Sequence, residues 1–179
     1  MREKIPLAIR PDSIDIRPPI LTFDGYYTDI FEVDEKSKVV YHRAVYKIAF
    51  FLAKEFHWNI MYGWDNKDDP EKHTAFIFIH PEAAFSRGFK VPVIGAACFR
   101  WREYVDHDHT WILNWIWLHP YFRRKGILQK HWNFFHEKFG DFHFEYPYSN
   151  AMKNFLVKND CIKRASALHN AIIRNEVFP

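Results

Sequence analysis

The sequence contains little of what marks secreted, disulfide-bonded or membrane-spanning proteins. Its two cysteines, Cys98 and Cys161, form no CxxC pair, so a reduced intracellular protein with free, mostly buried thiols fits better than a disulfide framework. No stretch approaches the roughly 18 to 20 apolar residues that cross a bilayer, and the first residues lack the apolar core of a signal peptide. These absences predict a cytoplasmic protein with no membrane partner.

Charge of one sign is also scarce in any one place. The formal net charge is +3 with neutral histidines, the calculated pI is 8.8, and no run of five or more like charges occurs. Basic tails that bind nucleic acid carry such runs, so a nucleic-acid partner is not expected. Binding of nucleic acid through Arg123, Arg124, Lys125 and Lys130 remains a further alternative, and a homodimer is compatible with the composition.

Apolar and aromatic residues are abundant, at 48% and 19% of the 179 residues. Such a chain lies far from disordered and low-complexity compositions, and a domain of this size buries about two-thirds of the surface of its unfolded form. Four prolines near the start disfavour helix and central strand there: Pro6, Pro11, Pro18 and Pro19. We therefore expect an extended N-terminal arm over residues 1–19 and a single domain over residues 20–179.

The first half of that domain alternates between strand and helix periodicity. Residues 20–34 mix β-branched and aromatic residues around Asp24-Gly25, which predicts one strand or a short hairpin. Over residues 39–56 the apolar spacing changes to that of an amphipathic helix. After a polar loop, three strand-like runs follow at residues 73–80, 91–101 and 110–118.

The second half predicts a crossover. An apolar helical stripe over residues 124–139 stops at Gly140, which suits a left-handed C-cap, and a short strand follows within residues 141–147. Ser149 or Asn150 can cap a further helix to about residue 158, and a helical tail follows. The fold class is thus α/β (α+β): a mixed, mostly antiparallel central sheet with a β-α-β crossover and helices on both faces.

The segment LNWIWLHPYFRRKGIL, residues 113–128, carries the clearest chemical signal. An apolar strand ends at Leu118, a basic turn follows, and Gly126 leads into the helix. The first turn of a helix leaves backbone N–H groups unpaired and carries about half a positive charge, so it binds anions. Gly126 allows a ligand to approach the backbone closely, and the cations beside it add charge-assisted contacts to phosphate oxygens.

The spacing of these residues resembles the central signature of the GNAT (GCN5-related) N-acetyltransferase superfamily. Leu118, Pro120, Arg123 and Gly126 stand at four of its positions, whereas Leu128 stands where the family has Gly or Ala. A strand, a proline and solvated basic residues before a helix also form an ordinary α/β connection. The spacing, together with the flanking order of elements, favours the family.

The resemblance extends, with less specific motifs, over residues 30–159. PVIGAACFRWREY is similar to the family's preceding strand, and FHFEYPYSNAMKNFLVKN to its fifth strand and following helix. Residues 29–56 are also faintly similar to the cohesion-type lysine acetyltransferases. The resemblance implies acetyl-CoA as co-substrate, with its pyrophosphate on the backbone N–H groups of residues 123–128. The residues it assigns to the coenzyme are Trp117, Leu118, Arg123, Arg124, Lys125, Gly126, Ile127, Leu128 and Asn150.

Acetyl transfer to an amine needs a polarised thioester carbonyl, a base for the amine and a proton for the leaving thiolate. The resemblance implies that a backbone N–H near Trp117 or Leu118 polarises the carbonyl. Glu145, on the short strand that the family places beside the acetyl group, is the first candidate for the base, with Asp106 and Asp108 as alternatives. Tyr146 and Tyr148 are candidates for the proton donor, although each of these side chains also fits a plain surface position.

Two other clusters have a structural explanation that we prefer to a chemical one. The VDHDH segment, residues 105–109, resembles a set of metal ligands, but no third and fourth ligand can be placed, and we expect a polar hairpin tip and no metal. Trp111, Trp115 and Trp117 alternate along one strand, which puts them on one face and indicates core packing more than a substrate groove.

The sequence therefore predicts an acetyl-CoA-dependent N-acetyltransferase that acts on a small amine, a peptide N-terminus or a lysine. The alternative is a non-catalytic acyl-CoA-binding or interaction module of the same fold. The larger Leu128 and the absence of a carboxylate from the signature strand motivate this alternative.

Overall fold

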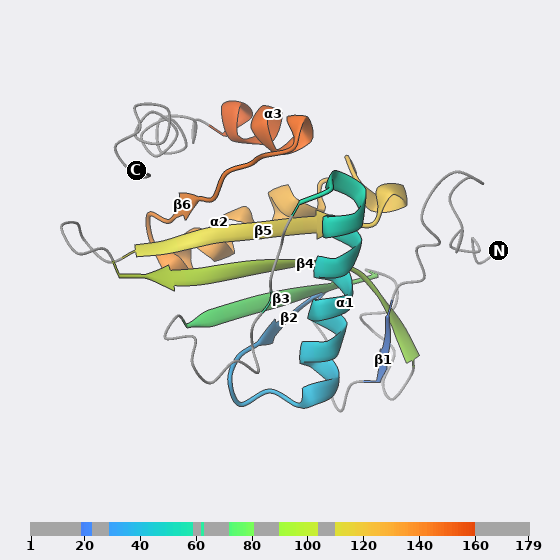
Figure 1. Ribbon diagram of the computed structural model, residues 1–179. Coiled ribbons are helices and arrows are strands. Elements are labelled where there is room, and N and C mark those ends of the chain that lie inside the picture. Colours follow the sequence, from blue (N-terminus) through green and yellow to red (C-terminus); the bar gives the residue numbers. More distant parts are fainter. Residues whose placement is uncertain are drawn as a thin grey trace.

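The structure is a computed structural model that describes residues 19–22, 29–58, 62, 72–80, 90–103 and 110–159. Most of the predicted N-terminal arm, the VDHDH segment and the predicted helical tail lie outside these residues. The described part is built on a six-stranded mixed sheet in the order β2-β3-β4-β5-β6, with β1 paired to β4 (Figure 1). The strands are β1 (Ile20–Thr22), β2 (Ile30–Val33), β3 (His73–Ile79), β4 (Lys90–Arg102), β5 (Thr110–Leu118) and β6 (His143–Phe144).

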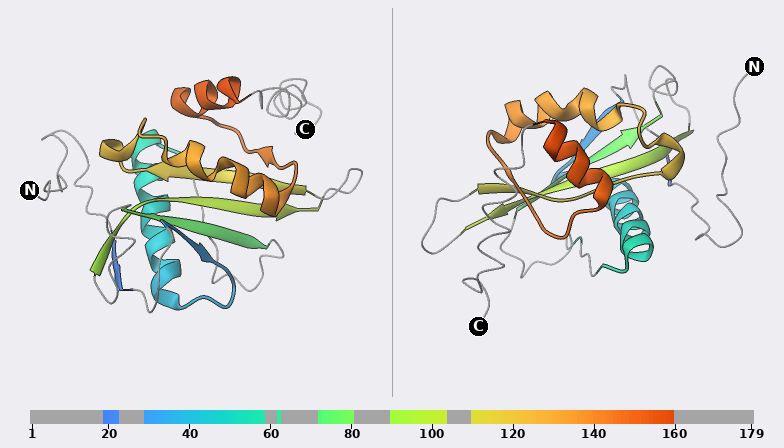
Figure 2. Two further views of the ribbon diagram at one scale, coloured as in Figure 1. Left: turned by 180° about the vertical axis from the view of Figure 1, so that it is seen from behind. Right: turned by 90° about the horizontal axis from the view of Figure 1, so that it is seen from above.

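Three α-helices of the described residues accompany the sheet: α1 (Val39–Phe56), α2 (Ile127–Phe139) and α3 (Asn150–Lys158). Helix α1 crosses one face, and α2 and α3 lie on the other, as the two opposite views show (Figures 1 and 2). Each face has its own hydrophobic core. The first cluster joins α1 to one face of the sheet, and the second joins α2 and α3 to the opposite face. Helices on both faces were predicted, and this is confirmed.

The strand pairing confirms the predicted crossover. All pairs are antiparallel except β5 with β6, which are parallel and connected through α2. Strand β4 comes closest to the end of β5 at Gly95, where an added Cβ would lie 2.4 Å from the carbonyl oxygen of Trp117. Only glycine permits this approach, so Gly95 sets the position of the last residues of β5 and of the turn that follows them.

Strand β5 contains one extra residue, Asn114. Cys98 pairs with Trp115 and Phe99 pairs with Leu113, so Asn114 is a β-bulge without a partner on β4. One extra residue reverses the faces of everything beyond it. Trp115 and Trp117 therefore belong to the first cluster, while Trp111 packs against the second. The prediction that the three tryptophans share one face is wrong for this reason.

Other boundaries also differ from the prediction. Residues 20–34 form neither one strand nor a hairpin, because β1 pairs with β4 and β2 with β3. Helix α2 begins three residues later than expected, because Arg124 and Gly126 in the basic turn have φ of 61° and 77°. A 3-10 helix, η2 (Pro120–Phe122), precedes this turn.

Gly140 and Ser149 stand at helix ends, as the sequence predicted: Gly140 at the end of α2 and Ser149 before the start of α3. Gly140 ends α2 with φ of 66° and ψ of −139°, a conformation open to glycine but outside the left-handed helical region expected for it. Ser149 caps α3, because its Oγ accepts the N–H of Met152 at 3.2 Å. Strand β6 is shorter than residues 141–147.

Cys98 is a free, buried thiol, and burial raises its pKa well above the ordinary value. Cys161 lies outside the described residues. Within the described part of the chain, no helix is long and apolar enough to cross a membrane.

Candidate active site

The parallel strands β5 and β6 stay together for only two residue pairs. Ile112 pairs with His143 and Leu113 with Phe144, and the last contact is the N–H of Glu145, which donates to the carbonyl oxygen of Leu113 at 3.1 Å. Beyond it the chain turns away toward α3. Residues 114–118 of β5 therefore have β4 on one side and no further strand of the described chain on the other.

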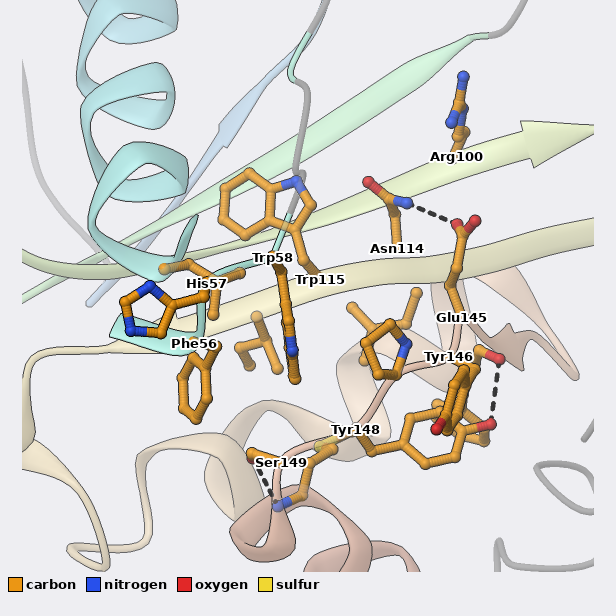
Figure 3. Close-up of a pocket in the computed structure, with 16 residues that line it drawn as sticks. Phe56, His57, Trp58, Arg100, Asn114, Trp115, Glu145, Tyr146, Tyr148 and Ser149 are labelled. Atoms are coloured by element: carbon orange, nitrogen blue, oxygen red, sulfur yellow. Dashed lines mark hydrogen bonds between the residues drawn. The ribbon is translucent and has the colours of Figure 1, made fainter. Parts of the chain in front are cut away.

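A cavity of about 490 Å³ occupies this divergence (Figure 3). The end of α1 (residues 56–58) forms one wall, the middle of β5 (residues 113–116) forms the floor, and the segment from β6 into α3 (residues 144–149) forms the other wall. Leu52 and Trp115 of the lining belong to the first cluster, whereas Leu113, Phe144 and Met152 belong to or pack against the second. The cavity is thus lined by residues from both hydrophobic clusters.

Glu145 is fixed in this cavity by two neighbours. Arg102 Nη2 donates to its Oε1 at 2.5 Å, and Nδ2 of the bulge residue Asn114 donates to its Oε2 at 2.5 Å (Figure 3). An ionised carboxylate has about four lone-pair directions, so each oxygen keeps one for a ligand. The bulge and the first residue after β6 together place a negatively charged acceptor beside the floor of the cavity.

Two tyrosines follow Glu145 along the same wall. Tyr148 is half-buried, and its hydroxyl donates to the carbonyl oxygen of Phe144 at 3.4 Å. Burial raises the pKa of Tyr148, and the neighbouring Tyr146 raises it further, so Tyr148 is protonated at neutral pH. Tyr146 is 51% exposed, and its ring centroid lies 5.8 Å from that of Tyr148.

The basic turn after β5 is held by an internal ion pair. Arg123 Nη1 and Nη2 donate to the two carboxylate oxygens of Glu55 at 2.6 Å each, and its Nε donates to the carbonyl oxygen of Leu118 at 2.8 Å. Trp117 Nε1 also donates to Glu55, at 2.7 Å. Burial would raise the pKa of Glu55, but the hydrogen bonds from Arg123 and Trp117 outweigh it and lower the pKa.

This ion pair restricts what the turn can offer to an anion. The guanidinium of Arg123 is occupied by Glu55, and its backbone N–H donates to the carbonyl oxygen of Pro120 at 3.3 Å. Of the predicted anion-binding stretch, the part from residue 124 onward is left. Arg124, Lys125 and Gly126 are exposed there, and the Nζ of Lys125 lies 3.7 Å from the centroid of the Tyr121 ring.

The N-terminus of α2 is open. No side chain of the described residues caps it, and the N–H of Lys130 donates to Gly126, as the first bond of a helix does. The backbone N–H groups of residues 127–129 come before that bond, so the helix itself offers them no acceptor. A Cβ built on Gly126 meets nothing within 4 Å. Leu128, which replaces the small residue of the family signature, packs against the second cluster and so leaves the open side clear.

The predicted site residues fall into two groups. Glu145, Tyr146 and Tyr148 come together at the cavity, whereas residues 124–128 form the end of the turn after β5 and the start of α2, and Asn150 begins α3 as an exposed residue. Trp117 and Leu118 do not line the cavity; the residues of β5 that do are 113–116. Asp106 and Asp108 lie outside the described residues.

The sequence did not point to the wall that α1 contributes. Phe56, His57 and Trp58 line the cavity, and His57 ends the helix with φ of 55°. The sequence gives one sign of this wall: the aromatic residues Phe56 and Trp58 stand at the end of the apolar helical stripe and just after it. Asn114 is the one polar residue in the interior of its strand, but no pattern in the sequence indicates that it forms a bulge.

Comparison of the chain with models of known protein families gave no match, and comparison with curated proteins gave none either. Function must therefore be inferred from the cavity and the turn themselves.

Proposed function

We propose that the protein is an acetyl-CoA-dependent N-acetyltransferase that moves the acetyl group from the thioester to a primary amine by direct attack. One observation carries the proposal: a cavity lined by residues from both hydrophobic clusters lies beside the unpaired side of β5, and the N-terminus of α2, which has no side-chain cap, follows the turn after β5. A two-substrate transfer needs access from two sides and an anchor for a phosphorylated carrier, and this arrangement supplies both.

The anchor fits a diphosphate. The amides at the start of α2, the exposed cations Arg124 and Lys125, and the free space around a Cβ position at Gly126 provide donors, positive charge and room. Acetyl-CoA is a substrate here and brings an activated thioester. The protein's own side chains need only hold that thioester in the divergence of β5 and β6 and manage two protons.

Those two protons have candidate partners on one wall. Glu145 accepts the proton that the amine loses as its nitrogen forms the new bond to the carbonyl carbon. Tyr148, protonated at neutral pH, donates a proton to the sulfur as the carbon–sulfur bond breaks. Backbone N–H groups of β5 near residues 114–116 border the cavity and are the candidates for polarising the carbonyl, a contribution typically worth about 3 kcal/mol.

A non-catalytic acyl-CoA-binding module is the second candidate. The observation that favours it is that both oxygens of Glu145 already accept hydrogen bonds within the protein, one of them from the cation Arg102. Release of free thiol from acetyl-CoA in the presence of an amine separates the candidates, because a binding module releases none.

Binding of acetyl-CoA is tested with a matched pair of glycine variants. Gly126 and Gly140 stand at the two ends of α2, both have positive φ, and a Cβ on either meets nothing within 4 Å. Gly126→Glu places a negative charge at the proposed diphosphate site, whereas Gly140→Glu carries a similar backbone strain at the other end. At about 100 times its Kd, acetyl-CoA stabilises a binding protein by about 2.7 kcal/mol.

We expect acetyl-CoA to raise the melting temperature of the parent protein and of Gly140→Glu, and to leave that of Gly126→Glu unchanged. Absence of any shift in the parent protein would refute the proposed function. An equal shift in all three proteins would show that the diphosphate of acetyl-CoA does not bind at the N-terminus of α2.

A further inference from the structure

We infer that the half of the cavity nearest α1 binds an acceptor with one amino group and an aromatic or other large apolar body. This inference rests on the proposed function, because it assigns the other half of the cavity to the thioester arm of acetyl-CoA. It excludes polyamines, amino sugars and lysine-rich peptides as the preferred acceptors.

The two faces of the sheet divide the cavity between the two substrates. Helix α2, whose N-terminus is the proposed diphosphate site, lies on the face opposite α1 (Figures 1 and 2). A carrier anchored there enters the divergence of β5 and β6 from the face of α2 and α3. The side of the cavity bordered by Phe56, His57 and Trp58 is left for the acceptor, which attacks the carbonyl carbon from the face of α1.

That side is walled by aromatic rings. Phe56 and Trp58 stack on each other with their ring centroids 4.7 Å apart and their planes at 25°. Both pack against the first cluster, to which the buried Trp115 of the lining belongs. Tyr146 stands on the opposite wall with its ring half-exposed (Figure 3). Flat and edge-on contacts to such rings stabilise an aromatic ligand beyond the area that it buries.

The charges of the described residues that line the cavity do not match a polycation. Glu145 is the one carboxylate among the described residues that line the cavity, and Arg102 and Asn114 already hold it. Arg100 of β4 adds a positive charge to the same lining. Several ammonium groups in a partly enclosed cavity would need several carboxylates. A single amino group beside Glu145, with the remaining body against the aromatic wall, is the chemistry that this lining accepts.

The acceptor class is tested with a panel of amines, by measuring the release of free thiol from acetyl-CoA. The panel consists of tryptamine, ethylamine, spermidine and a lysine-containing peptide. Burial of the indole ring of tryptamine in the cavity lowers the free energy of binding. We therefore expect a kcat/KM for tryptamine about 100-fold above that for ethylamine. A preference for spermidine or for the peptide, or equal rates with ethylamine and tryptamine, would overturn the inference.

Variants of the aromatic wall locate the effect. Trp58→Ala should raise the KM for tryptamine about 10-fold and leave the KM for acetyl-CoA unchanged, and Trp58→Phe should keep most of the affinity for tryptamine. Phe50→Ala is the control, because Phe50 is on α1, which leads into the aromatic wall, is 48% exposed and does not line the cavity. An equal loss in Phe50→Ala, or a parallel change in the KM for acetyl-CoA, contradicts a specific acceptor wall.

Titration with tryptamine in the absence of acetyl-CoA, followed by calorimetry, keeps the two proposals distinguishable. Saturable binding that Trp58→Ala weakens supports the inference, even if acetyl-CoA itself fails to bind and the proposed function is lost. Binding of acetyl-CoA together with a preference for polycations leaves the proposed function intact and refutes the inference.

Discussion

Glu55 and Arg123 connect the end of α1 to the basic turn that precedes α2. Their side chains are 26% and 31% exposed, and the two parallel bonds of 2.6 Å give the fork-like geometry in which arginine binds a carboxylate most strongly. The third bond of Arg123 holds the last carbonyl of β5. One ion pair therefore fixes the turn relative to α1 and to the end of β5.

Glu55→Gln should lower the free energy of unfolding by about 1–2 kcal/mol, because a charged acceptor of two arginine bonds and one indole bond becomes a neutral amide. Urea denaturation measures the change. Glu32→Gln is the control: Glu32 accepts from Lys138 at 2.9 Å but is 40% exposed, and exposed pairs contribute about 0.5 kcal/mol or less. Equal effects of the two substitutions would show that the pair at Glu55 has no special weight.

The pH dependence of that difference has a definite sign. The folded-state pKa of Glu55 lies below its ordinary value of 4.5, so its contribution is complete above that value and is lost as the pH falls through the lower folded-state pKa. The stability difference between the parent protein and Glu55→Gln should therefore be constant from about pH 6 to 8 and shrink below about pH 4.5.

At the scale of elements, the bulge at Asn114 decides which side chains meet. With the bulge, Trp115 and Trp117 face α1 while Leu113 faces α2, and the Asn114 carboxamide reaches Glu145. Without it, residues 115–118 would turn to the opposite faces. The bulge thus lies where the sheet opens, and its side chain orients the candidate base.

Deletion of Asn114 should prevent stable folding, because it would move Trp117 and Trp115, which are 2% and 5% exposed, to the opposite face of the sheet. We expect the loss of stability to exceed the roughly 4 kcal/mol that marks severe single changes. Asn114→Gly keeps the extra residue and removes only its side chain, so it should fold with a loss of about 1–2 kcal/mol. Circular dichroism during heating measures both. A deletion variant that melts like Asn114→Gly would show that the register tolerates a shift.

The same element shows how far the sequence could predict the fold. The bounds of α1 and the three central strands follow from apolar periodicity, which burial on one or both faces imposes directly. A single inserted residue leaves no trace in composition, so the bulge and the faces of the tryptophans were not predictable. The sequence also does not show which strands pair: nothing in residues 20–33 distinguishes pairing of β1 with β4 from pairing between β1 and β2.

The candidate site divides in the same way. The places of Glu145 and the two tyrosines beside β5 follow from the order of elements, since Glu145 comes directly after the strand that pairs with β5. Glu55 and the α1 wall depend on how a helix end meets a turn 68 residues later in the chain, and this contact is set by packing of the whole domain. No local pattern encodes it.

At the scale of the whole molecule, three histidines that are buried among the described residues link stability to pH. His42, His119 and His131 are 4%, 1% and 6% exposed, and burial lowers the pKa of each. Although Asp29 Oδ2 lies 3.2 Å from His131 Nε2, burial outweighs this carboxylate, which is paired with Lys130. His119 shows the consequence most clearly, because its Nδ1 accepts the N–H of Tyr121 and cannot do so when protonated.

The unfolded chain takes up protons at these histidines near pH 6.5, and the folded chain takes them up only at lower pH. Stability should therefore be flat above about pH 7 and fall as the pH drops toward about 5, by up to about 1.4 kcal/mol per pH unit for each histidine. Urea denaturation at a series of pH values measures this slope. Three described carboxylates have a lowered pKa: Asp29, Asp34 and Glu55. They change the stability mainly below their ordinary pKa values of 3.8 and 4.5, so we assign the fall between about pH 7 and 5 to the histidines. His131→Gln should reduce the slope by up to about one-third while leaving the flat region flat; an unchanged slope would mean that His131 is protonated in the folded protein and paired with Asp29.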